Sequence, residues 1–304
     1  MSAGSNEITE RHPNSWRMLI APSLYAAGLL LIFALLVMNV DTVVDVHNAR
    51  GENDHLPEVA RRGRALIFSA SVIVSASLGA GLLAVSFTYV TQNMREDELP
   101  ESNLFLLLLA ASISFVLTIG NSSEMLRGVE SIASPGSEVA TTWRFTKAVE
   151  LSNGIHMAAS TSAVLVIFML AYADRRPQSG TKSQHQERIS MLISLAALLL
   201  ISVLMFDRAY LSWALSDLLL REETATSAKL YVNGVCTLNA LFESLLLLGA
   251  WLGAVLLSDR IAAWSTPKEV MAALRRSDGL GIGASLGPLV VALVLQAATG
   301  FSGG

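Results

Sequence analysis

Five polar or ionisable residues interrupt stretches of the chain that are otherwise apolar: Glu150, Asn153, His156, Asn239 and Glu243. Steps of three or four residues place the first three on one helical face and the last two on another. Histidine exchanges its proton near neutral pH, and a glutamate offers a carboxylate to a cation or a proton. Because ionisable side chains are costly inside a membrane and commonly mark a substrate or ion pathway, the pattern predicts a polar layer within a helix bundle.

The predicted layer has two interpretations. In the first, it lines a water-filled cavity or an ion path, with His156 and Glu243 as its titratable members. In the second, it is a buried network that holds helices together, at about 0.6 kcal/mol for an average membrane hydrogen bond. Ser75 falls at a similar depth on a third apolar stretch. The two interpretations differ in whether these side chains converge on one hydrated cavity.

Signals for catalysis, cofactors and metals are weak in this sequence. It contains no His-Glu-x-x-His pattern and no phosphate-binding loop. Its single cysteine, Cys236, can form neither an internal disulfide nor a CxxC motif. Asp45 and His47 offer ligand types that bind metals, but residues two apart point to different sides of a helix. We therefore predict no catalytic residue, no cofactor and no metal site, and we expect that the protein is not an enzyme.

The elements that must position these residues are long apolar segments. Hydrophobic residues make up 52% of the 304 residues and charged residues only 15%, against about 25% charged in soluble domains. The mean hydropathy is +0.51. A transmembrane helix needs roughly 20 apolar residues to cross about 30 Å of hydrocarbon. Seven stretches qualify, at about 18–40, 65–91, 103–120, 149–173, 189–206, 235–257 and 280–299.

The spacing of these stretches predicts an all-α, polytopic membrane helix bundle of about seven transmembrane helices. A short polar segment, 1–17, precedes a single transmembrane domain over 18–300, and 301–304 form a tail. The helices are expected to pair as three helical hairpins, followed by a seventh, C-terminal helix. Several glycines and Pro288 in this helix leave two alternatives open, a continuous span or a helix that is broken or does not fully span. The expected hairpins cover about 18–93, 103–174 and 189–259, and the seventh helix covers about 280–299.

Three connections, 41–64, 121–148 and 207–234, are longer and amphipathic. In the last of them, apolar residues from Leu211 to Leu219 recur at the period of an amphipathic helix. The sequence therefore predicts helices that project past the membrane surface before the chain turns back. Asp207 and Arg208, at the start of this connection, either pair with neighbouring side chains or are ordinary interfacial charges, and the second interpretation is favoured.

Lysine and arginine are concentrated in the shorter loops 174–188 and 258–279 and near the N-terminus. Because cytoplasmic loops carry an excess of these residues, we expect an integral protein of the plasma (inner) membrane with its N-terminus cytoplasmic and its C-terminus outside. Arg61, Arg62 and Arg64, in a loop that this orientation places outside, argue against it.

The lipid bilayer is the expected partner. Small-xxx-small pairs such as Ser75/Gly79 and Gly249/Gly253 let helices approach closely. The helices that meet there belong either to one chain, to two copies of it, or to this chain and another membrane subunit. No block of basic residues suggests nucleic acid.

Taken with the polar layer, these features favour a channel or transporter for an ion or small solute. The alternative is a non-catalytic membrane scaffold, sensor or accessory subunit that docks partners through its long amphipathic extramembrane helices.

Overall fold

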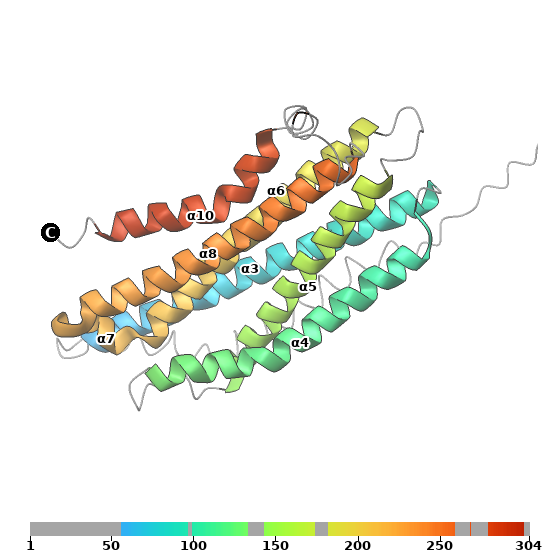
Figure 1. The fold of residues 1–304 in the computed structure, drawn as a ribbon. Helices are drawn as coiled ribbons and strands as arrows, with labels where there is room; N and C mark the ends of the chain where they lie inside the picture. Colours follow the sequence, from blue (N-terminus) through green and yellow to red (C-terminus); the bar gives the residue numbers. More distant parts are fainter. Residues whose placement is uncertain are drawn as a thin grey trace, which may run out of the picture.

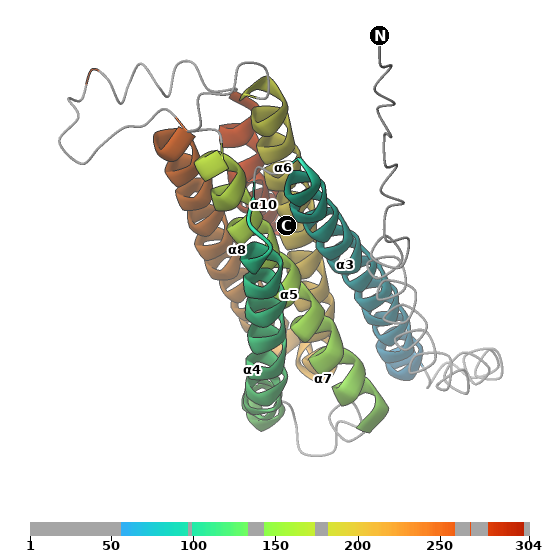
Figure 2. The ribbon, with the colours of Figure 1, turned by 90° about the vertical axis from the view of Figure 1, so that its right-hand side faces the viewer.

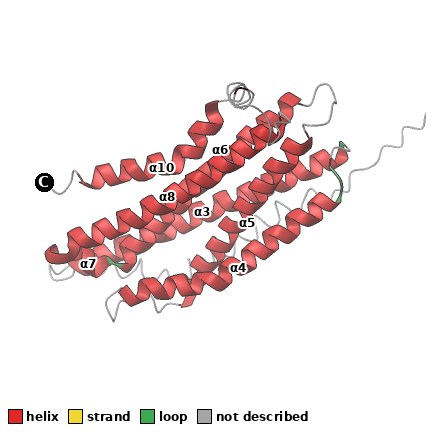
Figure 3. Ribbon diagram, viewed as in Figure 1, coloured by secondary structure: helices red, strands yellow, loops and turns green. Residues whose placement is uncertain are grey.

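The computed structural model describes residues 56–96, 99–132, 143–173, 182–258, 268 and 279–300. Every regular element in these residues is a helix (Figure 3). The helices are α3 (Leu56–Arg95), α4 (Ser102–Ile132), α5 (Trp143–Ala173), α6 (Lys182–Ala214), α7 (Ser216–Leu220), α8 (Glu222–Ser258) and α10 (Gly279–Gly300) (Figure 1).

Six of these helices are long and apolar enough to cross a membrane, which confirms the predicted class of fold. They correspond to the second through seventh predicted spans, whereas the first, at 18–40, lies outside the described residues. The seventh predicted span is also a helix in the structure. Residues Gly281–Ala298 form a candidate span although Pro288 stands inside the helix.

Several helices are much longer than a bilayer requires. α3 has 40 residues and α8 has 37, which correspond to about 60 Å and about 55 Å at the rise of an α-helix. Since the hydrocarbon is about 30 Å thick, both helices extend beyond it. The length of both helices fits the expected projections past the membrane surface, which stay a prediction. The amphipathic segment after α6 is interrupted, because the chain turns at Leu215 and again near Arg221.

α5 and α6 occupy the middle of the bundle. α4 packs along α5, α3 packs against both α5 and α6, and α8 packs between α6 and α10 (Figures 1 and 2). The pairs α4–α5 and α6–α8 are the hairpins expected for 103–174 and 189–259. Because α4 lies between them in the chain, α3 and α5 run in the same direction across the bundle.

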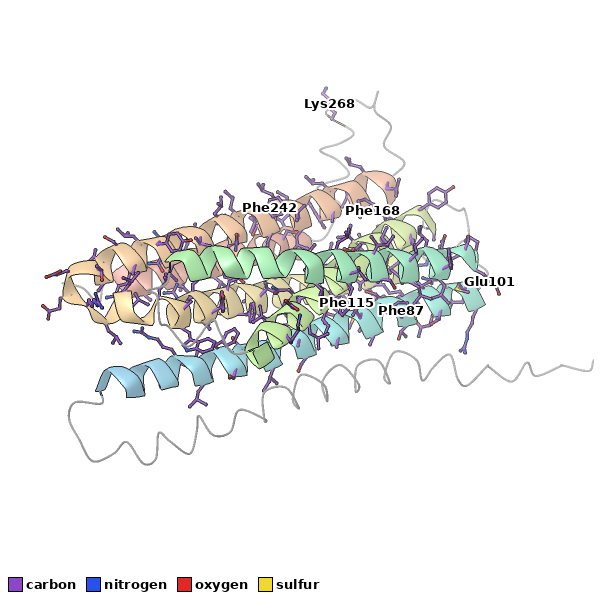
Figure 4. All side chains as sticks on the ribbon, turned by 90° about the horizontal axis from the view of Figure 1, so that it is seen from below. Phe87, Glu101, Phe115, Phe168, Phe242 and Lys268 are labelled. Carbon is purple, nitrogen blue, oxygen red and sulfur yellow. The ribbon has the colours of Figure 1, made fainter. Side chains whose placement is uncertain are left out.

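Glycines allow close approach at several of these contacts. A Cβ atom added to Gly154 of α5 would lie 2.8 Å from the ring of Phe115 on α4, and one added to Gly253 of α8 would lie 2.8 Å from the ring of Phe168 on α5 (Figure 4). A Cβ on Gly281 of α10 would overlap the indole of Trp251 on α8. Because helix association in membranes depends on packing and not on a hydrophobic driving force, these positions determine which helices pair.

We expect Gly154→Ala to destabilise the protein by about 1–3 kcal/mol, as overpacking does in other cores, because the ring of Phe115 must leave the α4–α5 contact. The measurement is the thermal unfolding midpoint in detergent. Gly81→Ala on α3 is the matched control. No neighbouring atom lies within 4 Å of its added Cβ among the described residues, so it should be neutral or gain up to about 1 kcal/mol from helix propensity. Equal midpoints for the two variants would contradict the packing role of Gly154.

The outer surface of the bundle is apolar. Each of the six long helices carries a large apolar side chain that is more than half exposed, among them Phe105 on α4 and Val294 on α10. Phe242 on α8 is another (Figure 4). Soluble monomers rarely expose contiguous apolar patches of more than a few hundred Å². Surfaces of this kind fit the acyl chains of a lipid bilayer, as expected for a multi-pass integral membrane protein.

Candidate functional site

His156 lies where α3, α5 and α6 meet. Its ring is 4% exposed, and Nε2 is 3.2 Å from the hydroxyl oxygen of Ser152 one turn earlier on α5. The ring meets Phe206 of α6 edge-on, with centroids 6.0 Å apart. On the other side it packs against Gly79 and the backbone of Ser75 on α3. Nδ1 makes no hydrogen bond of good geometry among the described residues.

Glu150 and Asn153 stand on the same helix, nearer its start. The Glu150 carboxylate accepts a hydrogen bond of 2.6 Å from the ammonium of Lys147, in an ion pair between a buried carboxylate and a side chain that is 45% exposed. The candidate span begins at Val149, so this pair lies at its edge. Asn153 is half-buried between Glu150 and His156. The ion pair favours an interfacial role for Glu150.

The other two predicted residues belong to a second group, between α6 and α8. The amide nitrogen of Asn239 donates a hydrogen bond of 3.2 Å to the carboxylate of Asp207. Glu243 stands one turn further along α8, and its charge interacts with that of Asp207. Its Oε2 is buried and has no hydrogen-bond partner in the part of the chain that the structure describes. Asp207, Asn239 and Glu243 are called the acidic group below.

α6 separates His156 from the acidic group. Phe206 contacts His156, while the next residue, Asp207, binds Asn239. Consecutive residues on a helix point in directions about 100° apart, so the two side chains face different neighbours. The five predicted residues thus fall into two groups on either side of one helix. The role of each group, as a path or as a structural network, stays a prediction.

Asp207 was not among the predicted site residues, because an interfacial charge was favoured over pairing with neighbours. The predicted span ended at Phe206, whereas α6 continues to Ala214 and the candidate span extends with it. Asp207 is consequently about two turns inside the helix, opposite Asn239. The available signal was the amphipathic repeat after Asp207, which already indicated that the helix continues.

Residues 283–287 formally match Gly-x-Ser-x-Gly, a pattern of serine hydrolases that the sequence interpretation did not use. In those enzymes the serine stands on a tight turn between a strand and a helix. Here Ser285 is buried inside α10, and its hydroxyl donates a hydrogen bond of 2.7 Å to the carbonyl of Gly281. Ser285 is therefore buried and bonded within its own helix, and the match to the pattern carries no argument for function.

Asp45 and His47, weighed above as metal ligands, lie outside the described residues. Cys236 is a buried free thiol on α8, one turn before Asn239. The chain matches no protein-family model, no curated protein and no solved structure.

Proposed function

We propose that this protein is a channel or transporter that moves a cation or a proton across the membrane, with the acidic group as its ion-binding site. One observation carries the proposal: two carboxylates from different candidate spans meet at the α6–α8 contact, where Asp207 is hydrogen-bonded to Asn239 and Glu243 stands one turn beyond Asn239. Two carboxylates in an apolar surrounding repel each other, and a bound cation or a shared proton relieves that repulsion.

The atoms around the two carboxylates fit this role. Asn239 uses its amide nitrogen on Asp207, which leaves its carbonyl oxygen as an acceptor. Oε2 of Glu243 has no hydrogen-bond partner among the described residues. Carboxylate and carbonyl oxygens are the ligands that hard cations prefer. The acidic group therefore offers oxygen ligands of the right kind on both helices of one hairpin.

Glu150, Asn153 and His156 form the other part of the proposed polar layer, across α6. Phe206 contacts His156, and its neighbour Asp207 binds Asn239, so the two groups lie on different sides of α6. Only a similar depth along the helices links Glu150, Asn153 and His156 to the transport cycle of the acidic group. The acidic group is the more direct candidate for ion binding, since it holds two carboxylates.

Reconstitution of the purified protein into liposomes tests the proposed function. With a pH-sensitive dye inside and gradients of H⁺, Na⁺ or K⁺ imposed in turn, at least one ion should move faster than in protein-free liposomes. A correctly folded protein that moves none of the three would contradict ion transport.

The second candidate is a membrane scaffold or accessory subunit. Its support is the length of α3 and α8 beyond the bilayer, together with Leu230 and Tyr231 exposed near the start of α8. A protein that conducts nothing alone and co-purifies with one fixed membrane partner would favour this role.

A further inference from the structure

A line of buried polar side chains runs between α3 and α5, on the side of α6 away from the acidic group. Its members are Ser86 and Asn93 on α3 and His156 and Ser162 on α5, all at most 4% exposed. Each keeps one polar atom without a hydrogen-bond partner in the described part of the chain: Ser86 Oγ, Asn93 Nδ2, His156 Nδ1 and Ser162 Oγ.

The register of the two helices places these residues at successive levels. α3 and α5 run in the same direction, and Gly79 meets Ile155 and His156. Seven residues further along both helices, about 10 Å away, Ser86 comes level with Ser162. Another seven residues on, Asn93 accepts a hydrogen bond of 2.6 Å from the guanidinium of Arg188 on α6. The polar residues therefore recur at successive levels from His156 to Asn93, where α3 meets α6.

Ser86 and Ser162 differ from other hydroxyl residues of the bundle in the hydrogen bonds of their hydroxyls. Ser71, Ser77 and Thr88 of α3 all donate to carbonyls of their own helix, which is the usual arrangement for a serine or threonine in a helix. The hydroxyls of Ser86 and Ser162 do not make such bonds within the described residues. They are therefore available to a partner at the helix interface.

Water is the ligand that fits these atoms. Leaving one buried polar group unpaired costs about 1–3 kcal/mol, and most such groups in proteins have a protein or water partner. Internal water typically makes about three hydrogen bonds and needs two to four polar partners. Two buried residues with small side chains accompany these levels on α5: Ala159 stands between His156 and Ser162, and Ala163 directly follows Ser162.

The line ends in aromatic side chains on one side and in polar side chains, among them the fully buried Asn93, on the other. Beyond His156, Phe68 packs against Phe206, Tyr210 and Trp213, with ring centroids between 5.2 and 5.6 Å apart. At the other end, Asn93 and Arg188 stand next to the end of α3 at Arg95. Water entering beside Asn93 would meet polar atoms as far as His156 and then the packed aromatic rings around Phe68.

We propose that the α3–α5 interface holds internal water from Asn93 to His156, as a half-channel that gives water and protons access to His156 from the end of the bundle where α3 ends. This inference goes beyond the ion-binding role of the acidic group and does not depend on it, because α6 lies between the two.

Thiol accessibility tests the half-channel. In the full-length chain with its single cysteine replaced, Cys236→Ala, we introduce Ser86→Cys or Ser162→Cys, both nearly isosteric. A small, water-soluble methanethiosulfonate reagent reacts with hydrated thiols. The control is Ala196→Cys, at an equally buried position in the apolar core on α6. The two test thiols should react at least tenfold faster than the control. Equal rates in folded variants would overturn the proposal.

A second measurement uses the unaltered protein and so avoids any variant that fails to fold. X-ray radiolysis oxidises side chains that lie next to internal water. Leu82, buried on α3 between the levels of Gly79 and Ser86, should be oxidised more strongly than Leu107, equally buried on α4. Equal oxidation would also overturn the proposal. Neither readout measures ion flux, so failure here is distinguishable from failure of the proposed transport function.

Discussion

Glu243→Gln is expected to reduce cation or proton flux in liposomes to the level of protein-free liposomes, while the protein still folds. Glutamine keeps the shape of the side chain but removes the negative charge. Because the charge of Glu243 interacts with that of Asp207, the substitution also removes a repulsion between α6 and α8, and the fold should not weaken. The measurements are flux in reconstituted liposomes and the thermal unfolding midpoint in detergent.

The matched control is Glu223→Gln, which removes an exposed carboxylate from the first turn of the same helix. Its flux should equal that of the unaltered protein. If Glu243→Gln retains full flux, Glu243 has no part in the mechanism. If both variants lose flux equally, the loss reflects the lower total negative charge of α8 and not a specific ion-binding site.

Phe68→Ala should lower the free energy of unfolding by about 3–5 kcal/mol, the usual cost of removing a fully buried phenylalanine. Phe68 has no exposed surface and contacts three aromatic rings of α6. A cavity at this position would remove contacts between α3 and α6 that lie beside His156. Denaturant titration in detergent micelles, followed by tryptophan fluorescence, measures the change.

Phe105→Ala provides the comparison for this prediction. Phe105 on α4 is 68% exposed and faces the lipid side of the bundle, so its removal leaves no internal cavity. We expect its effect to stay within about 0.5 kcal/mol, as for other surface substitutions. A similar loss in both variants would mean that the aromatic cluster contributes no special stability.

Much of the architecture could be predicted from the sequence because membrane spans depend on local composition. A segment of about 20 apolar residues must form a helix in lipid, since its backbone polar groups have no other partners there. Six spans, including the one with Pro288, follow from this rule. The amphipathic repeat from Leu211 to Leu219 likewise indicated that α6 continues past its apolar stretch, as it does to Ala214.

The candidate site was predictable only in part. Periodicity places Asn239 and Glu243 on one face of a helix, and Glu150, Asn153 and His156 on one face of another. Periodicity does not tell which neighbour each face meets. The contact between Asn239 and Asp207 and the contact between His156 and Phe206 depend on how three helices rotate and cross.

The sequence by itself determined an all-helical membrane protein and the positions of six described spans. Only the tertiary structure decided that α6 divides the predicted polar residues into two groups, that Asp207 belongs with Glu243, and that Ser86 comes level with Ser162. The physical reason is that apolarity and helical period are properties of single segments. Helix pairing instead depends on close contacts between segments far apart in the chain, such as that of Gly79 with Ile155 and His156.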